Sequence, residues 1–360
     1  MNKSIMLLSI GLMAFLNASA AQAQMFKGKV ITMIINYGAG GNADTEGRIF
    51  ERHLGKHLEG KPGIIVQNVP GAGGLTAVNQ MGLGIGVRDP NLTLGFFTFN
   101  PIAVLIEDPG LRVKVETFPL VAGLGAYYVA YGRKDSLPGE RRPQDIARAK
   151  DINAAGYARN SSHDIRLRLM FEIMGTGHKV VTGFQSISAV NVAIEQNEIN
   201  FMVSTTPGYE TQAYPNLIQR GIAMPFWQLS ALTPEGKLVG SEKLTSQGIK
   251  FFEEVYEQAH GKKPSGPKYQ ALKVTDNLSA QLARIVAMPP NASREAVEEI
   301  RRAFHALQSD KDFLDEYVRV IKMEPVMISG ADAQKSLNDS LKTAVSAVKS
   351  ILREAGGMNE

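Results

Sequence analysis

Residues 30–44 read VITMIINYGAGGNAD, and residues 63–74 repeat the same order of features as GIIVQNVPGAGG. Each stretch begins with an apolar, β-branched run of strand length, which is typical of a strand covered on both faces. Each then enters a glycine-rich turn that precedes a segment with helical character. With a third apolar run at residues 92–99, this order predicts a βαβαβ unit of parallel strands with ligand sites at their carboxyl ends.

The two glycine-rich turns carry the strongest chemical signal. They consist of Gly38, Ala39, Gly40, Gly41 and Asn42 in the first turn and Gly71, Ala72, Gly73 and Gly74 in the second. Glycines ahead of a helix expose backbone N–H groups, and the helix dipole adds positive potential, so each turn can hold a carboxylate or a phosphate. The competing interpretation is that glycine only makes a tight turn. Because two successive turns share one sheet edge, we favour an anion-binding site.

Strands and helices continue to alternate along the chain. Further strands are expected at residues 127–131, 152–157, 179–182 and 199–204, with helices at residues 43–57, 164–174 and 294–308. Leu337, Leu341, Val345, Val348 and Leu352 recur at helical spacing and predict one final helix with a single apolar face. The polar stretch at residues 232–276 has no functional interpretation.

Composition excludes several classes of protein. A length of 360 residues favours two medium domains or one large one. The absence of cysteine excludes thiol catalysis, disulfides, Cys-ligated zinc and iron–sulfur clusters. The formal charge of +4 comes without a dense Lys/Arg block, so no nucleic-acid partner is expected.

The N-terminus has the features of a secretory signal peptide. Lys3 precedes an apolar run at residues 5–16, and residues 21–23 form an Ala-Gln-Ala cleavage signal, so the mature chain should begin near Gln24. The apolar run is too short to span a membrane as a stable helix. Without a cysteine to carry a lipid anchor, we expect a soluble periplasmic protein, and full secretion is the alternative.

Motifs for catalysis are incomplete. Gly38, Gly40 and Ala43 match the G-x-G-x-x-A dinucleotide fingerprint, but Gln67 and Asn68 stand where an acidic residue should hold the ribose. His53 and His57 lack a neighbouring metalloprotease base. We therefore expect a binding protein without catalytic residues, metal or cofactor. An exported enzyme that binds a nicotinamide dinucleotide is kept as the alternative.

Taken together, the motifs resemble the Bug-type solute-binding proteins of tripartite tricarboxylate transporters. The resemblance rests on GAGGNAD at residues 38–44, NVPGAGG at residues 68–74 and FPLVA at residues 118–122, with MPPNA at residues 288–292 and KMEPV at residues 322–326. The most specific motif is NVPGAGG, which is close to the family's N-R-P-G-A-G-G. The resemblance extends over nearly the whole mature chain.

The resemblance implies an α/β fold with two lobes, a Venus-flytrap periplasmic-binding-protein fold of type II-like topology. Residues 24–125 and 284–360 would form a discontinuous lobe 1, and residues 126–283 lobe 2, after a signal peptide at residues 1–23. Crossing strands are expected near residues 123–131 and 282–287. The resemblance also implies a monomer that delivers a small carboxylate to a membrane transporter, with a sensor kinase as the alternative partner.

The resemblance assigns binding roles to particular residues. The two loops that grip a ligand carboxylate become residues 38–42 and 71–74. The family's acidic residue after the first loop is Asp44, which would accept a hydrogen bond from the ligand or else complement the helix N-terminus. Ser162 matches a serine of the second-lobe turn and is also an N-cap candidate.

Departures from the family pattern concern the ligand. Arg159 replaces a common glycine and would pair with a second ligand carboxylate, unless it is a surface residue that points away. Ser204 replaces the usual Asp, which argues against a ligand with an amino group. Phe97 and Phe99 would supply an apolar wall if they are not simply core residues. The expected ligand is therefore a small mono- or dicarboxylate, and an aromatic one is favoured if Phe99 lines the cleft.

Overall fold

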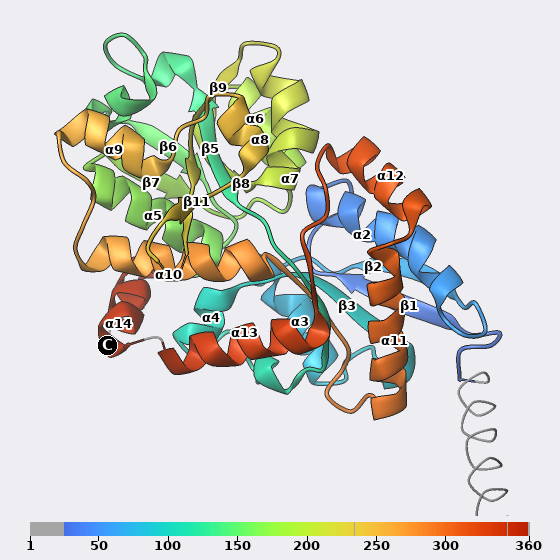
Figure 1. Ribbon diagram of the computed structural model, residues 1–360. Coiled ribbons are helices and arrows are strands. Elements are labelled where there is room, and N and C mark those ends of the chain that lie inside the picture. Colours follow the sequence, from blue (N-terminus) through green and yellow to red (C-terminus); the bar gives the residue numbers. More distant parts are fainter. Residues whose placement is uncertain (1–24, 234, 344, 359–360) are drawn as a thin grey trace, which may run out of the picture.

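The protein is a two-lobed α/β molecule in which each lobe is built on its own β-sheet (Figure 1). The computed structural model describes residues 25–233, 235–343 and 345–358. The expected signal peptide lies outside the described residues.

The first sheet has six strands in the order β13-β4-β12-β3-β1-β2. Its strands are β1 (Val30–Ile35), β2 (Gly63–Asn68), β3 (Thr93–Thr98), β4 (Leu120–Leu124), β12 (Arg284–Ala287) and β13 (Met327–Ser329). β1 pairs in parallel with β2 and β3, whereas β12 runs antiparallel to β3 and β4. The two quoted stretches therefore form adjacent parallel strands, as the sequence predicts.

The second sheet has five strands in the order β7-β6-β8-β5-β9. Its strands are β5 (Tyr128–Arg133), β6 (Ile152–Ala155), β7 (His178–Val181), β8 (Phe201–Thr205) and β9 (Ala223–Leu229). β6 pairs in parallel with β7 and β8, and β5 runs antiparallel to β8 and β9. Five neighbouring strands of the first sheet, β2-β1-β3-β12-β4, thus have the same arrangement as the whole second sheet. In each sheet, one strand arrives from the other lobe and lies antiparallel beside the third strand of this order. β12 lies in this way beside β3, and β5 lies beside β8.

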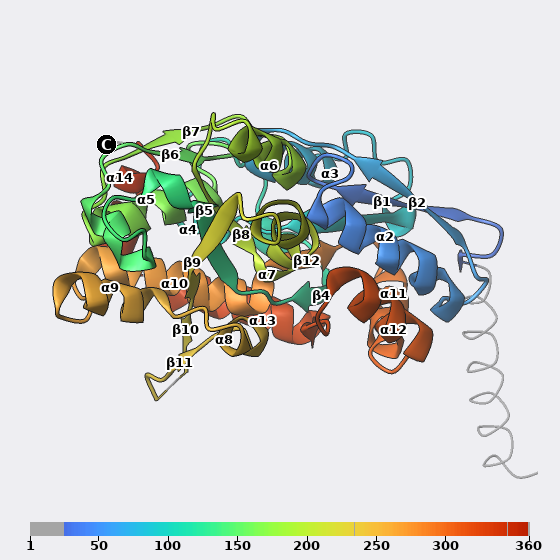
Figure 2. The same ribbon diagram turned by 90° about the horizontal axis from the view of Figure 1, so that it is seen from above.

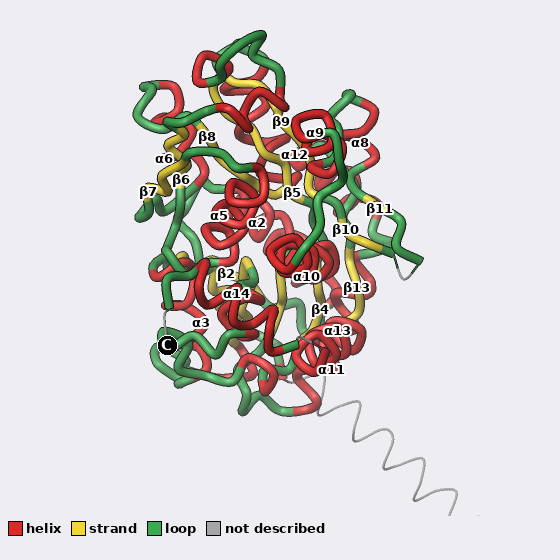
Figure 3. The backbone as a smooth tube through the Cα atoms, turned by 90° about the vertical axis from the view of Figure 1, so that its left-hand side faces the viewer, coloured by secondary structure: helices red, strands yellow, loops and turns green. Residues whose placement is uncertain are grey.

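Helices cover both faces of both sheets, and Figure 3 shows the strands lying between layers of helix. The helices near the first sheet are α2 (Asn42–Leu54), α3 (Leu75–Gly82), α4 (Pro101–Leu105), α11 (Arg294–Leu307), α12 (Lys311–Ile321) and α13 (Gly330–Thr343). Those near the second are α5 (Ser162–Met174), α6 (Ile187–Glu195), α7 (Thr206–Gly208), α8 (Glu242–Ser246), α9 (Phe252–His260), α10 (Pro267–Leu282) and α14 (Ser346–Ala355). A π-helical segment, Tyr209–Ile218, follows α7, and β10 (Ala231–Leu232) and β11 (Leu238–Val239) form a small hairpin.

Alternating side chains of β1 separate the two cores of the first lobe. Ile31, Met33 and Ile35 are buried with Phe50 of α2 and with residues of α11 and α12. Ile34 faces the opposite way, into a cluster with residues of α3 and α13. This period of two explains why the continuous apolar run forms a strand that is buried on both faces.

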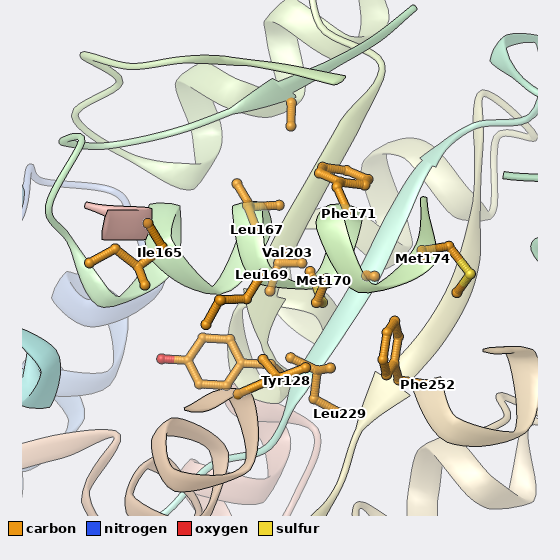
Figure 4. Close-up of a cluster of buried hydrophobic side chains, with 14 of the residues drawn as sticks. Tyr128, Ile165, Leu167, Leu169, Met170, Phe171, Met174, Val203, Leu229 and Phe252 are labelled. Atoms are coloured by element: carbon orange, nitrogen blue, oxygen red, sulfur yellow. The ribbon is translucent and has the colours of Figure 1, made fainter. Parts of the chain in front are cut away.

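The core of the second lobe is built around α5 and β8. Figure 4 shows Leu169, Phe171 and Met174 of α5 packed near Val203 and Phe252. α10 borders this core and continues directly to β12, so the chain passes between the sheets there and also at residues 125–127. The lobe boundaries that the sequence suggests stay our proposal.

The C-terminal end differs from the sequence prediction. The single final helix is wrong, because α13 ends at Thr343 and a separate helix, α14, begins at Ser346. Leu337 is buried in the core beside the first sheet, whereas Val348 and Leu352 are buried with α5 in the second lobe. Figure 2 shows α14 beside α5 and far from α11 and α12. The apolar residues from Leu337 to Leu352 are therefore divided between the cores of the two lobes.

Candidate functional site: a cavity between the lobes

A cavity lies between the two lobes, at the carboxyl ends of the parallel strands of both sheets. Its lining residues are Tyr37, Gly41, Asn42, Ala43, Gly73, Thr98, Phe99, Asn100, Tyr128, Tyr157, Ser161, Ser162, His163, Ser186, Ile187, Val203, Ser204, Thr205 and Arg284. Such positions follow strand ends, where loops of an open α/β sheet converge on ligands.

The first-lobe wall is rich in backbone donors. The N-cap residues of α2 and α3 are Gly41 and Gly74, and neither has a side chain to cap its helix. The N–H groups of Asn42, Ala43 and Gly73 donate no hydrogen bond within the described part of the chain. Free N–H groups at a helix N-terminus attract an anion through both hydrogen bonding and the helix dipole.

Asp44 holds the first glycine turn in place. Its carboxylate accepts hydrogen bonds from the Gly40 amide (3.0 Å), from Arg48 (3.0 Å) and from the Asn68 side chain (3.0 Å). Burial would raise the pKa of Asp44, but these hydrogen bonds outweigh it and lower that pKa below its ordinary value. Asp44 is therefore an ionised support for the loop, and it does not line the cavity.

The second-lobe wall presents hydroxyl groups, and its helices are capped by their own side chains. Ser161 Oγ accepts from the Asp164 amide (3.1 Å) at α5, and Ser186 Oγ accepts from the Ala189 amide (3.2 Å) at α6. Thr205 Oγ1 accepts from the Gly208 amide (3.4 Å) at α7. Each of these side chains satisfies one N–H group that would otherwise be open to a ligand.

Arg284 is the arginine among the lining residues, and its charge is already matched. It is 3% exposed, and its Nε lies 2.6 Å from Glu46 Oε2. Its Nη1 donates to Thr98 Oγ1 at 2.7 Å, and the Tyr317 hydroxyl donates to the other oxygen of Glu46 at 2.6 Å. The pair fixes β12 against α2 and leaves no net charge at this end of the cavity.

Aromatic rings line part of the cavity. Tyr37 and Tyr157 contact edge to face at 5.3 Å between centroids, and Tyr157 lies 4.8 Å from the His163 ring. Burial is the main cause that raises the pKa of both Tyr37 and Tyr157 far above the ordinary value, with the negative charge of Asp164 as a smaller cause. These two phenols therefore stay neutral at physiological pH.

Direct hydrogen bonds join the two lobes around the cavity. Asn42 Nδ2 donates to Thr205 Oγ1 at 3.0 Å, and Ser188 Oγ donates to the Gly40 carbonyl at 3.2 Å. The Ser162 amide donates to Asn100 Oδ1 at 3.0 Å. The lobes are thus closed on each other, and part of the glycine turn bonds with the opposite lobe.

Comparison with known proteins gives similarity in structure but not in sequence. No protein-family model matches the chain, and no curated protein matches it. The periplasmic binding protein BugD superposes with a TM-score of 0.67 at 12% identity, covering 92% of this chain and 99% of that one. MatC from Rhodopseudomonas palustris, solved with malate, gives a TM-score of 0.67 at 14% identity over 91% of this chain and 100% of its own.

A second R. palustris protein, solved with adipate, gives a TM-score of 0.64 at 15% identity, covering 92% of this chain and 98% of that one. This chain has the periplasmic-binding-protein fold. The two-lobed α/β architecture expected from the sequence is therefore confirmed.

Within this periplasmic-binding-protein fold, some of the sequence-predicted site residues line the cavity and others do not. Gly41, Asn42, Gly73, Phe99, Ser162 and Ser204 line it. The predicted residues that are not among the lining residues are Asp44 and, from the same two turns, Gly38, Ala39, Gly40, Gly71, Ala72 and Gly74. Whether any of these residues contacts a ligand stays a prediction.

Arg159 lies away from the cavity. Its side chain is exposed, and its guanidinium lies against Gly357 near the C-terminus. A pairing of Arg159 with a second ligand carboxylate therefore has no support from the fold, and the surface alternative describes its position. The reason is that the turn after β6 directs Arg159 outward while the next residues, Ser161 and Ser162, begin α5 at the cavity.

The sequence analysis missed most of the cavity's aromatic and charged side chains. The missed aromatic and charged residues are Tyr37, Tyr128, Tyr157, His163 and Arg284, and the amide side chain of Asn100 was missed as well. Tyr37, Asn100 and Tyr157 follow shortly after β1, β3 and β6, so the strand-end rule that selected the glycine turns would also have found them. Arg284 and Tyr128 begin the strands that cross between lobes, and only the pairing of the sheets brings them to the cavity.

No helix within residues 25–233, 235–343 or 345–358 is both long and apolar enough to cross a membrane. The same described ranges contain no group of three or more His, Cys, Asp or Glu side chains placed to hold a metal ion.

Proposed function

We propose that this protein is an extracytoplasmic solute-binding protein that captures a small organic carboxylate between its lobes. The observation that carries the proposal is that Asn42, Ala43 and Gly73 line one cavity at the starts of α2 and α3, and that their N–H groups have no hydrogen-bond partner among the described residues. A carboxylate accepts hydrogen bonds from such groups without needing a cationic side chain. No side chain in the cavity has the arrangement of an activated nucleophile, so binding rather than catalysis is the proposed activity.

The proposed mechanism is closure around the bound acid. The carboxylate binds to the first lobe, and the second lobe then closes, forming the hydrogen bonds from Asn42 to Thr205 and from Ser188 to Gly40. A ligand that contacts both lobes shifts the population toward the closed form. The closed form is then recognised by a membrane transporter of the tripartite tricarboxylate type.

The solved proteins that share the fold support this proposal. BugD is described as a periplasmic binding protein, and MatC was solved with malate. A periplasmic location and a carboxylate ligand for this chain follow by analogy. The dinucleotide alternative gains no support. A dinucleotide site needs an acidic residue at the end of the second strand to bind the ribose, and Asn68 stands there, with its side chain donating to Asp44 and to the Tyr37 carbonyl.

The test is a thermal-shift titration of the exported chain against small mono- and dicarboxylic acids and against nicotinamide dinucleotides. The expected result is a melting temperature that rises with the concentration of at least one acid, because a ligand that binds only the folded state stabilises it by mass action. A response to dinucleotides and to no acid would contradict the proposal. The transporter partner is then tested by deleting the gene for this protein in a strain that expresses the transporter constitutively and measuring uptake of the same acid. Loss of uptake supports delivery to the transporter, whereas intact uptake indicates a sensor protein.

A further inference from the structure

The two walls of the cavity offer different chemistry. The first lobe presents open N–H donors at uncapped helix ends, whereas the helices of the second lobe are capped by Ser161, Ser186 and Thr205. The two ends of a ligand that bridges the lobes therefore meet different surroundings. If the carboxylate lies at the first lobe, the second lobe determines what the far end of the ligand must be.

Tyr128, the first residue of β5, provides an unused hydroxyl group in the cavity. The residue is 7% exposed, and its hydroxyl makes no hydrogen bond with any described residue. Figure 4 shows this hydroxyl pointing away from Leu229 and Phe252 of the hydrophobic cluster. The Arg166 guanidinium carbon lies 3.9 Å from the Tyr128 ring centroid, and Arg166 is itself held by Asp276 at 2.9 Å. The ring is therefore fixed from behind by a cation–π contact.

Tyr157 provides a second unused hydroxyl group from the same lobe. It also lines the cavity, and its hydroxyl has no hydrogen-bond partner among the described residues. Its ring is held between Tyr37 and His163 by edge-to-face contacts. Both hydroxyls thus belong to residues that line the cavity and have no protein partner, so a ligand in the cavity can form hydrogen bonds with them.

The charges around these phenols disfavour a second carboxylate. Asp164 is fully buried directly behind Tyr157, whose amide donates to Asp164 Oδ1 at 2.8 Å, and Asp164 Oδ2 accepts no hydrogen bond. His163 contacts Asp164 through Nδ1 at 3.1 Å and the Val203 carbonyl through Nε2 at 2.7 Å, so both of its ring nitrogens already have partners. Arg284 is matched by Glu46, and Arg166 by Asp276. The lining thus contains no unmatched cation within the described chain.

We propose that the protein selects monocarboxylates whose far end is an uncharged hydrogen-bonding group, received by the hydroxyls of Tyr128 and Tyr157. A hydroxyl or carbonyl group at that end satisfies both phenols. A second carboxylate would lose its hydration beside Asp164 without gaining a cation, and burial of an unpaired charge is strongly unfavourable. This inference rests on the proposed function and goes further by naming the ligand class.

The first test compares matched ligands by isothermal titration calorimetry on the exported chain. Each pair shares one skeleton, such as 6-hydroxyhexanoate with adipate or 4-hydroxybenzoate with terephthalate, and the set extends over aliphatic chains of different length. The expected result is that the hydroxy acid binds at least about tenfold tighter than the dicarboxylate of the same skeleton, which corresponds to about 1.4 kcal/mol. Tighter binding of the dicarboxylates would overturn the inference but leave the proposed function standing. If no member of any pair binds the folded protein, the proposed function itself fails.

The second test removes the hydroxyls one at a time with Tyr128→Phe and Tyr157→Phe. Each variant should weaken binding of the hydroxy acid about fivefold and leave binding of the acid without the hydroxyl unchanged, because one hydrogen bond is removed and the ring is kept. Tyr256→Phe on α9 is the matched control, since that residue lies outside the cavity and its hydroxyl has no partner among the described residues. Equal losses for both ligands would show that the tyrosines only support the fold, and would overturn the inference.

Discussion

Gly73 shows how closure of the lobes constrains a single residue. It has a φ of 62°, in the region that favours glycine, and a Cβ atom there would lie 3.1 Å from the Cβ atoms of both Ala158 and Ser161. Ala158 and Ser161 follow β6 in the opposite lobe. The residue is therefore required for two separate reasons, a turn conformation and a close approach between lobes.

Replacing Gly73 by Ala separates these two reasons when Gly84→Ala is the control. Gly84 has a φ of 73° and no atom within 4 Å of its would-be Cβ, so its substitution adds only the backbone strain. Both variants should lose about 1–2 kcal/mol of unfolding free energy in urea titrations. Only Gly73→Ala should weaken binding of the acid, by at least about tenfold in calorimetry, because the methyl group holds the lobes apart. Unchanged affinity in Gly73→Ala would mean that the lobes do not close as described.

Glu46 illustrates the cost of leaving a buried charge unpaired. Glu46 and Arg284 are each 3% exposed and lie 2.6 Å apart. The variant Glu46→Gln leaves the Arg284 guanidinium without its counter-charge, so we expect a loss of about 3–5 kcal/mol in the free energy of unfolding. Glu51→Gln, on the same helix and without an ion pair among the described residues, should change it by less than about 0.5 kcal/mol. Chemical denaturation measures both values, and a similar small effect in the two variants would contradict the expectation.

At the scale of elements, the sequence predicts strands better than it predicts the C-terminal helices. The runs at residues 30–36 and 63–68 became β1 and β2, as their β-branched residues predict, but only β1 lies inside the sheet with buried residues on both faces. The expectation that the second run is covered on both faces is wrong, because β2 is the edge strand of the sheet and leaves Ile65 55% exposed. The apolar stripe from Leu337 to Leu352 did not reveal that α13 and α14 pack on different lobes. Helical periodicity indicates which face is buried but contains no information on which core buries it.

A charged cluster that should respond to acid joins the 3-10 turn Gly55–His57, which follows α2, to the N-terminus of α12. Asp310 lies 2.7 Å from Lys56 and 2.6 Å from His57, and it also caps α12. Burial would raise the pKa of Asp310, but hydrogen bonds from Lys56, His57 and the Phe313 amide outweigh it, so the pKa lies well below its ordinary value. Such a group stabilises the fold fully above the pKa of about 3.9 that it has when unfolded, and the contribution is lost as pH falls toward the folded-state pKa.

The variant Asp310→Asn removes the charge and keeps the capping side chain. We expect it to lower the free energy of unfolding by about 1.5 kcal/mol at pH 7. The difference from wild type should stay constant down to about pH 4.5 and shrink as pH falls toward 3. Denaturation measured across this range tests the sign. Asp312→Asn is the control, because its side chain is 84% exposed and lies 3.8 Å from Lys56, and an exposed pair at that distance contributes little. A difference that grows with acidity would contradict the assigned pKa shift.

At the scale of the whole molecule, the cavity combines features that differ in how well the sequence predicts them. The glycine turns could be found from sequence because each follows a strand and precedes a helix, and both lie on one sheet edge. Tyr128 and Arg284 could not, because each starts a strand that enters a sheet from the other lobe. Their place in the cavity depends on long-range pairing, which no local pattern encodes.

Closure of the molecule should be measurable as an energetic coupling between Asn42 and Thr205. Asn42 Nδ2 donates to Thr205 Oγ1 at 3.0 Å, and the two residues come from opposite lobes. In a double-mutant cycle of Asn42→Ala and Thr205→Val, each single variant weakens ligand binding, because the closed form loses one hydrogen bond. The double variant loses the same hydrogen bond only once, so its loss of binding free energy should be smaller than the sum of the two single losses. The difference is the coupling energy, which we expect to be about 1 kcal/mol, or about fivefold in Kd. Thr205 also caps α7, but that effect is present in both arms of the cycle and cancels. Strictly additive losses in calorimetry would show that this bond does not form in the ligand-bound state, and the closed form would then be held by the ligand alone.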